Sequence, residues 1–211
     1  MPVALAALCL LLVAVTIVAE ERGGGVVAQA VPKGAASACF IAVGALVGDP
    51  ASPAYAPMLA ALALGLVGDV LLVGASRGPF LAGLVAFLLS HFAWAAAFVL
   101  RGVSPPSTAL AVVMIVPVAL VVWRWLREPV AKKRMTGAVL AYIAVISGMV
   151  ACAAGTVAEV GGPMVLVGAV LFFLSDLTVA RRRFVVSDVW NRRIGLPLYY
   201  VAQLVLAATT C

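Results

Sequence analysis

The chain has 211 residues, of which 65% are hydrophobic and 10% charged, with a formal net charge of +6 and a mean hydropathy of +1.21. Soluble domains are roughly half apolar and about a quarter charged, so this composition excludes a soluble domain and predicts a polytopic membrane protein. The apolar runs are continuous and lack the alternation of membrane β-strands. We therefore expect an all-α transmembrane bundle, because only helices then satisfy the backbone inside lipid.

Apolar runs separated by short polar breaks predict the individual helices. About 17 residues are enough to cross the hydrocarbon core of a bilayer. Ser37 and Cys39 interrupt the second run, so seven helices is the alternative to a count of eight. The breaks leave no room for a soluble domain, and residues 1–211 are expected to form one transmembrane domain. The expected helices cover residues 3–19, 34–48, 54–75, 79–100, 107–126, 135–158, 160–180 and 195–211.

Basic residues gather at every second break. Counted from the N-terminus, the odd breaks and their flanks hold every lysine and arginine except Arg101. The positive-inside rule predicts that these breaks face the cytoplasm and that both termini are extracytoplasmic. This alternation favours eight helices over seven. It also explains the positive charge, so we expect the bilayer as partner and no nucleic acid. The expected location is the bacterial inner membrane.

Three ionisable side chains lie inside apolar runs. Asp69 is in the third run, His91, the only histidine, is in the fourth, and Asp176 is in the seventh. Such groups are costly in a bilayer and by default mark a functional site. At about 1.5 Å per residue, both aspartates lie roughly one and a half turns from the cytoplasmic ends of their helices, and His91 lies deeper. A structural role is the alternative, through hydrogen bonds between helices or pairing of Asp176 with a nearby arginine.

Further polar side chains reach the same level from the sixth and eighth helices, namely Tyr142, Tyr199, Tyr200 and Gln203. Polar groups from five helices would then line one cavity open to the cytoplasmic leaflet. The available chemistry is acid–base: a buried carboxylic acid can donate a proton while a second carboxylate or the imidazole accepts one from water.

Metal and serine chemistry are less favoured. Asp and His are ordinary metal ligands, but no HExxH or comparable spacing occurs, so we expect no metal or other cofactor. Ser90 and Ser175 each directly precede an ionisable residue, and adjacent helical residues point about 100° apart. Neither serine has the Gly-x-Ser-x-Gly elbow of a lipase.

The polar residues belong to longer motifs. These are Gly65-x-x-Gly68-Asp69-x-x-Leu72, Phe80-x-x-Gly83-Leu84-x-x-Phe87-x-x-x-His91, Tyr142, Gly168-Ala-x-Leu-Phe172-x-x-Ser175-Asp176-x-x-x-Ala180-x-x-x-Phe184 and Tyr199-Tyr200-x-x-Gln203. Together they resemble the YhhN-type family of lysoplasmalogenase-like membrane proteins, over nearly the whole chain and in the family's order. The chain differs at Pro32-Lys33, where the family tends to have Lys-Pro, and at Trp94, where it often has Tyr.

The resemblance implies an eight-helix bundle that hydrolyses the vinyl ether bond of lysoplasmalogens to a fatty aldehyde and glycerophosphoethanolamine or glycerophosphocholine. That reaction passes through an oxocarbenium ion, as glycoside hydrolysis does with two carboxylates. Our hypothesis is that Asp69 and Asp176 supply the acid and the stabilising carboxylate, and that His91 positions or deprotonates water. Alternatives are a proton-coupled transporter or a hydrolase of another ether or ester lysolipid. The candidate substrate-binding residues are Tyr142, Ser175, Tyr199, Tyr200 and Gln203.

Overall fold

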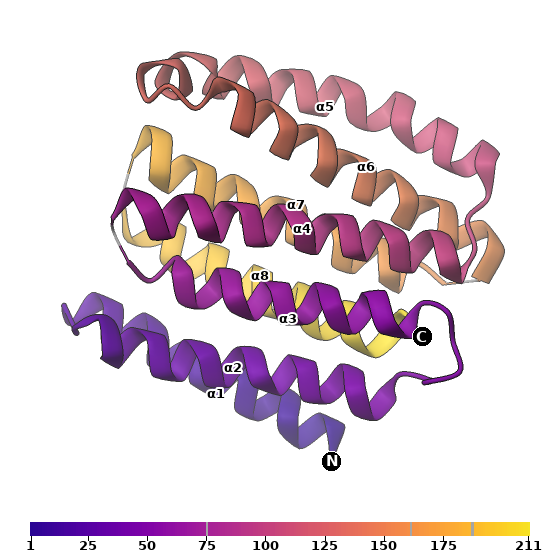
Figure 1. The fold of residues 1–211 in the computed structure, drawn as a ribbon, viewed down its shortest axis with the longest axis horizontal. Coiled ribbons are helices and arrows are strands. Elements are labelled where there is room, and N and C mark those ends of the chain that lie inside the picture. Colours follow the sequence, from indigo (N-terminus) through magenta and orange to yellow (C-terminus); the bar gives the residue numbers. More distant parts are fainter. Residues whose placement is uncertain (75, 161, 187) are drawn as a thin grey trace.

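The structure, a computed structural model, describes residues 1–74, 76–160, 162–186 and 188–211. Ala75 and Gly161, which fall within the expected helices 54–75 and 160–180, lie outside the described residues. The described chain is all-helical, as predicted, and contains eight α-helices and a single π-helical turn (Figure 1). These are α1 (Pro2–Glu21), α2 (Val26–Val47), α3 (Tyr55–Leu71), α4 (Arg77–Arg101), α5 (Pro105–Lys132), α6 (Thr136–Val160), α7 (Met164–Ala180), η1 (Arg181–Val185) and α8 (Val189–Thr209).

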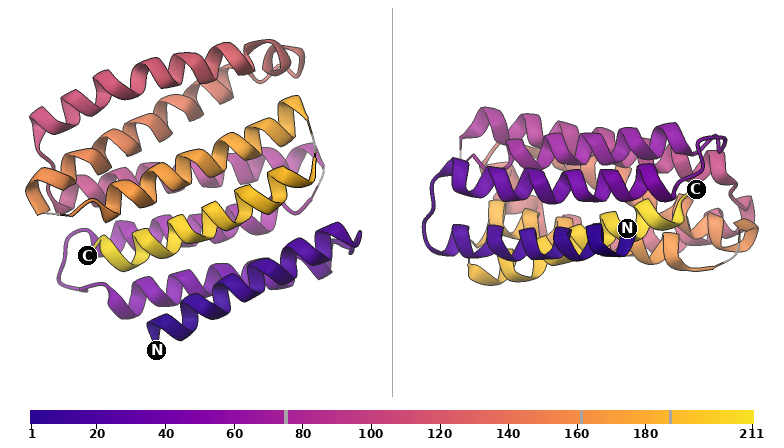
Figure 2. Two further views of the ribbon diagram at one scale, coloured as in Figure 1. Left: turned by 180° about the vertical axis from the view of Figure 1, so that it is seen from behind. Right: turned by 90° about the horizontal axis from the view of Figure 1, so that it is seen from below.

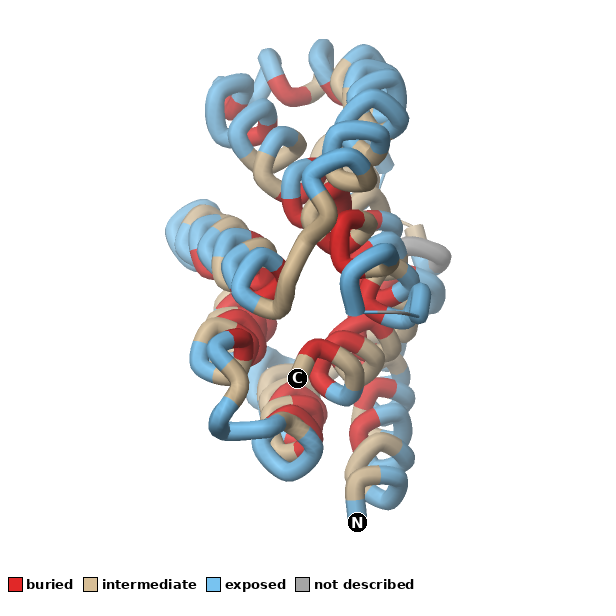
Figure 3. Tube along the Cα trace, turned by 90° about the vertical axis from the view of Figure 1, so that its right-hand side faces the viewer, coloured by how far each residue is buried: buried red, intermediate tan, exposed pale blue. Residues whose placement is uncertain are grey.

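Six of the helices close into a ring. Each packs on the next in the order α2, α3, α4, α6, α7 and α8, and α8 packs back on α2. Helix α1 covers α2 and α8 from outside, and α5 lies outside α6 (Figures 1 and 2). Viewed along the helices, the buried residues face the interior of this arrangement (Figure 3). The interior of the ring is therefore where a polar site can be shielded from lipid.

The outer surface is apolar, as a bilayer requires. Leucine and valine side chains on α1 and α5 are widely exposed, for example Leu11 at 61% and Val113 at 67%. Six helices of the described chain are long and apolar enough to cross a membrane, and α3 is a shorter apolar helix of 17 residues. The first two turns of helix α8 include the charged residues Arg192 and Arg193.

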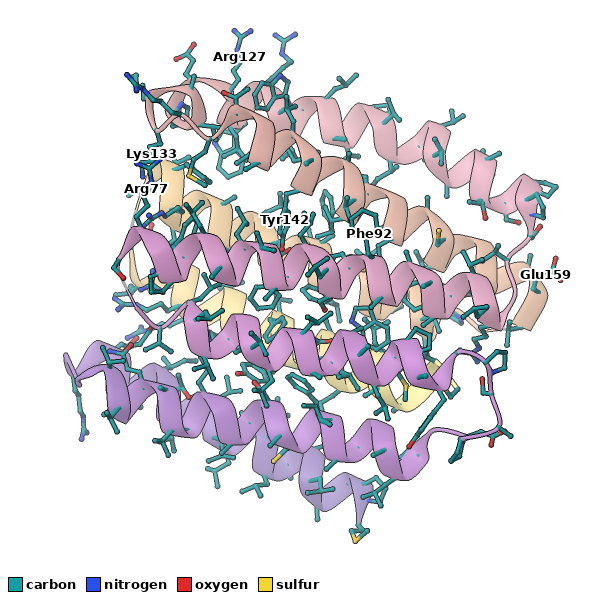
Figure 4. All side chains as sticks on the ribbon, in the orientation of Figure 1. Arg77, Phe92, Arg127, Lys133, Tyr142 and Glu159 are labelled. Carbon is teal, nitrogen blue, oxygen red and sulfur yellow. The ribbon has the colours of Figure 1, made fainter. Side chains whose placement is uncertain are left out.

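Basic residues other than Arg101, which ends α4 at the opposite end, collect at one end of the bundle. Arg77, Arg127 and Lys133 lie at the end that holds the turns after α1, α3, α5 and α7, whereas Glu159 lies at the opposite end (Figure 4). Both chain termini also lie toward that opposite end (Figure 1). We call the basic end the Arg-rich end. The membrane face to which it belongs stays a prediction.

Two helices begin well before their expected starts. Helix α2 begins at Val26 rather than at residue 34, and α8 begins at Val189 rather than at residue 195. Pro32 and Lys33, interpreted as part of a break, lie inside α2. A charged residue is tolerated there because it is paired with an aspartate of the neighbouring helix, as described below.

Candidate active site

A cavity of about 460 Å³ occupies the half of the ring nearest the Arg-rich end. All eight helices and η1 contribute to its wall. The wall is apolar for most of its area, with Leu126, Ile143 and Phe173 among its residues, and both Asp69 and Asp176 line it. The two carboxylates that the sequence singled out therefore face the same enclosed space.

Asp69 lies near the end of α3 and is almost completely buried. Its Oδ1 is 3.3 Å from Nζ of Lys33. Its Oδ2 accepts hydrogen bonds from Oγ of Ser37 at 2.7 Å and from the hydroxyl of Tyr200 at 3.3 Å. An ammonium group and two hydroxyl donors together stabilise the ionised form of a buried carboxylate. These contacts from α2 and α8 fix the position of the Asp69 carboxyl.

Asp176 lies on α7 and has different partners. Its Oδ2 accepts a hydrogen bond of 2.7 Å from the hydroxyl of Tyr142 on α6. Nε2 of His91 on α4 lies 3.3 Å from the same oxygen. This contact is within ion-pair range, although its angles are not those of a hydrogen bond. Side-chain exposure is 15% for Asp176 and zero for His91, so the carboxylate faces the cavity and the imidazole lies behind it.

The helix backbone determines which ring nitrogen of His91 carries the proton in the neutral form. Nδ1 lies 2.6 Å from the carbonyl oxygen of Phe87, one turn earlier in α4. A carbonyl oxygen only accepts hydrogen bonds, so Nδ1 is the protonated nitrogen. Nε2 then faces Asp176 either as a bare acceptor or, in the imidazolium, as a second donor. The contact is attractive when one proton is present, either on the carboxyl or on Nε2 of the ring.

The remaining candidates lie on α7 and α8. Tyr199 lines the cavity, and its hydroxyl accepts a hydrogen bond of 3.1 Å from Nε2 of Gln203. Ser175 also lines the cavity, but its Oγ donates to the carbonyl of Phe172 in its own helix. Tyr200 and Gln203 are fully buried and support the wall from behind. The structure therefore brings Tyr142, Ser175 and Tyr199 to the cavity itself.

The sequence analysis does not identify several residues in or behind the cavity wall. Lys33, which lines the cavity, falls in an expected break, and Ser37, which lies behind the wall and donates to Asp69, counts there only as an interruption of an apolar run. Arg182, Arg183 and Arg192 were read as topology signals, yet they line the cavity at the Arg-rich end. The seven-residue spacing of Ser37 and Gly44, two buried polar or small positions of α2, was an available signal of an inward face. Among the described residues, no group of three or more His, Cys, Asp or Glu side chains could hold a metal ion.

Comparison with known proteins identifies the relatives of this fold. Residues 4–210 match the model of the YhhN family. The chain belongs to the YhhN family. The human protein named Lysoplasmalogenase TMEM86A is 29% identical over 163 residues, which cover 74% of this chain and 66% of the human protein. The protein of the same name from Bos taurus is 27% identical over 161 residues, or 74% of this chain and 65% of the bovine protein.

The chain thus spans just under two thirds of the length of these relatives. No solved structure gives a significant match. The family membership inferred from the motifs is confirmed.

Glycines of the YhhN motifs bring α3 close to its neighbours. A Cβ atom added at Gly65 would lie 2.7 Å from Nε2 of Gln203 and 2.9 Å from the hydroxyl of Tyr199. A Cβ atom at Gly68 would lie 2.6 Å from the ring of Phe87. Real Cβ atoms do not approach so closely, so a larger residue at either position would displace these side chains. Gly65 therefore sets the distance between α3 and the polar residues of α8, and Gly68 sets the distance between α3 and α4.

Proposed function

We propose that this YhhN-family protein is a membrane-embedded hydrolase that cleaves the vinyl ether bond of lysoplasmalogens. The products are a fatty aldehyde and glycerophosphoethanolamine or glycerophosphocholine. The observation that carries the proposal is the contact of Asp176 with His91 and Tyr142 on the wall of a cavity that Asp69 also lines. The names of the human and bovine relatives support the same activity.

The cavity suits a lipid with a single chain. It contains acidic and basic side chains at the Arg-rich end and apolar side chains further in. Val122 and Leu177 belong both to its wall and to an apolar groove between α5 and α7, which is also lined by Val121 and Trp125. We assign the groove to the aliphatic chain, because its lining is apolar. We assign the Arg-rich end to the headgroup, because its charged side chains suit a polar group.

The pair formed by Asp176 and His91 is the proposed proton donor. It holds one proton at the cavity wall, and Tyr142 orients the carboxyl. This proton is transferred to the alkene carbon that is not bonded to the ether oxygen. The positive charge is then shared by the other alkene carbon and the ether oxygen. Water then adds to that carbon and returns a proton to the Asp176 and His91 pair, which is thereby regenerated.

The resulting hemiacetal collapses to products. One proton moves from its hydroxyl group to the glycerol oxygen, the bond between carbon and that oxygen breaks, and aldehyde and alcohol separate. No cofactor is needed for the balance of atoms or electrons.

Asp69 is the proposed electrostatic stabiliser. Lys33, Ser37 and Tyr200 hold its carboxylate in place, so it does not need to reorganise as positive charge develops on the substrate. Preorganised charge of this kind is the largest single contribution in many enzymes. We therefore assign the acid to Asp176 and the fixed anion to Asp69. By the positive-inside rule we also propose that the Arg-rich end faces the cytoplasm.

The test is aldehyde release by detergent-purified protein. Lysoplasmenyl-ethanolamine is compared with the intact two-chain plasmalogen and with the saturated alkyl-ether lysolipid. We expect aldehyde from the lyso vinyl ether and none from the saturated ether, which cannot be protonated at carbon. A folded protein that releases no aldehyde would contradict the proposal. Fatty acid release from an ester lysolipid, or proton-coupled uptake into vesicles, would then identify the alternative function.

A further inference from the structure

The mouth of the cavity is more basic than topology requires. The described cavity-lining residues at the Arg-rich end include the guanidinium groups of Arg182, Arg183 and Arg192 and the carboxylate of Glu20. The positive-inside rule explains the presence of arginines at this end but does not require them to face an internal cavity. Their side chains therefore need a separate explanation.

The π-helical turn η1 helps to turn two consecutive arginines toward the cavity. In an α-helix, neighbours in sequence point about 100° apart. Arg182 and Arg183 both line the cavity within η1. Nζ of Lys133 donates a hydrogen bond to the carbonyl oxygen of Arg183. Single π-helical turns occur frequently at functional sites, and this one is held by Lys133, which directly follows α5.

Arg183 is held in place but keeps a donor available. Its guanidinium carbon lies 3.9 Å from the centre of the Phe80 ring, which also lines the cavity. Stacking of this kind orients the planar group without using its N–H donors. Nε of Arg183 is buried and has no hydrogen-bond partner among the described residues. A buried guanidinium donor with no acceptor is costly, so a bound acceptor would stabilise it.

Arg192 on α8 also keeps a donor available. Its Nε is buried, has no hydrogen-bond partner among the described residues and lies 3.6 Å from Oε2 of Glu20. Arg182 contacts the other oxygen of Glu20 at 3.5 Å. Charge-assisted hydrogen bonds are typically about 2.7–2.9 Å long, so Glu20 orients these arginines loosely. One carboxylate also leaves the three positive charges incompletely neutralised.

We propose that Arg183 and Arg192 form a binding site for a phosphate ester, and this inference rests on the proposed function in assigning that phosphate to the lysolipid headgroup. Guanidinium groups match phosphate oxygens in geometry and charge. At about 1.5 Å per residue, Arg183 lies roughly 10 Å along the helix from Asp176. A glycerol backbone together with an arginine side chain bridges that distance. The phosphate therefore sets how deeply the vinyl ether enters the cavity.

The first test compares two substrates that share the vinyl ether. Lysoplasmenyl-ethanolamine carries the phosphate, and 1-alkenylglycerol lacks it. For Arg183→Gln and Arg192→Gln, we expect KM for the phospholipid to rise about ten-fold, the size expected for loss of a charge-assisted hydrogen bond. KM for 1-alkenylglycerol should change less than two-fold. Arg183→Lys should recover part of the loss, because it restores the charge but not the planar fork.

The matched control is Arg193→Gln. Arg193 follows Arg192 directly in α8, but its side chain is 50% exposed, pairs with Glu21 and does not line the cavity. Its replacement should leave both KM values unchanged. An equal rise in KM for both substrates in Arg183→Gln and Arg192→Gln would overturn the phosphate site while leaving the hydrolase intact.

The second test does not depend on turnover. Glycerophosphoethanolamine and inorganic phosphate are added separately, and the midpoint of thermal unfolding is measured in detergent. We expect glycerophosphoethanolamine to raise the midpoint in the natural protein and in Arg193→Gln, but not in the double variant Arg183→Gln with Arg192→Gln. The same effect with both ligands would overturn the lipid assignment in favour of free phosphate. No effect with either would overturn the site, whatever the outcome of the aldehyde assay.

Discussion

Nζ of Lys33 and Oδ1 of Asp69 lie 3.3 Å apart, with 12% and 2% of the respective side chains exposed, and this ion pair joins α2 to α3 inside the bundle. Removing one partner of a buried pair leaves an uncompensated charge, at a cost of roughly 3–5 kcal/mol. We therefore expect Lys33→Met to lower the free energy of unfolding by about that amount. Denaturant unfolding in detergent measures it.

The double variant Lys33→Met with Asp69→Asn removes both charges and should be more stable than Lys33→Met alone. Lys132→Met, at an exposed position of the same charge, should have little effect on stability. Equal destabilisation in the single and double variants would show that the pair is not the source of the effect.

Asp176→Asn should strongly slow aldehyde release while leaving the fold intact. The amide cannot deliver the proton, and the carboxyl already faces the cavity, so nothing in the core must repack. General acid catalysis contributes about 10²–10⁴-fold, which is the loss in kcat that we expect for Asp176→Asn. The assay is single-turnover aldehyde formation. Glu159→Gln, at the opposite end of the bundle, is the control that should keep full activity (Figure 4).

His91→Gln should lower kcat by a similar factor if Asp176 and His91 share the transferred proton. The combined loss in the double variant His91→Gln with Asp176→Asn should be much smaller than the product of the single losses, because the residues act as one unit. Fully multiplicative losses would argue for independent roles.

Tyr142→Phe removes the hydroxyl that donates to Asp176 and keeps the ring against His91. We expect kcat to fall about ten-fold, since one hydrogen bond to a charged group is worth roughly 1.5–3 kcal/mol. KM should change little. Tyr55→Phe removes a hydroxyl near the opposite end of the bundle, where it donates to the carbonyl of Ala45, and serves as the matched control.

Gly65→Ala should disturb the site through crowding. The added methyl would displace Gln203 and Tyr199, and overpacking of this kind costs typically about 1–3 kcal/mol. We expect a lower unfolding midpoint and a lower rate of aldehyde release. Gly148→Ala in α6 is the matched control, because its added Cβ would have no neighbour within 4 Å. A Gly65→Ala protein as stable and active as the natural one would contradict the packing described for α3 and α8.

The helices could be predicted from the sequence because the length of an apolar run and the charge of its flanks are local properties. The first residue of a helix is harder to predict from the sequence where that helix end is stabilised by residues far away in the chain. Lys33 could enter α2 only because Asp69, far along the chain, lies beside it. The early start of α8 likewise accompanies contacts of Arg192 and Arg193 with glutamates of α1.

Part of the candidate site could be predicted from the sequence for a similar reason. Aspartate and histidine inside apolar runs are visible in the sequence, and the structure brings His91, Asp176 and Tyr142 together. The sequence could not separate Asp69 from Asp176, because their different partners are contributed by α2, α4, α6 and α8. The catalytic roles of these residues stay predictions.

The cavity has an ionic end and an apolar side. At the Arg-rich end its wall carries ionic groups, while Val122 and Leu177 connect it to an apolar groove between α5 and α7. Helix α5 packs closely on α6 and on η1, and its middle borders this groove. For the proposed reaction, water and the polar product would exchange through one opening, and the aldehyde would pass sideways through the other. The fatty product would then stay in the bilayer, so its release would be governed by partition between two phases.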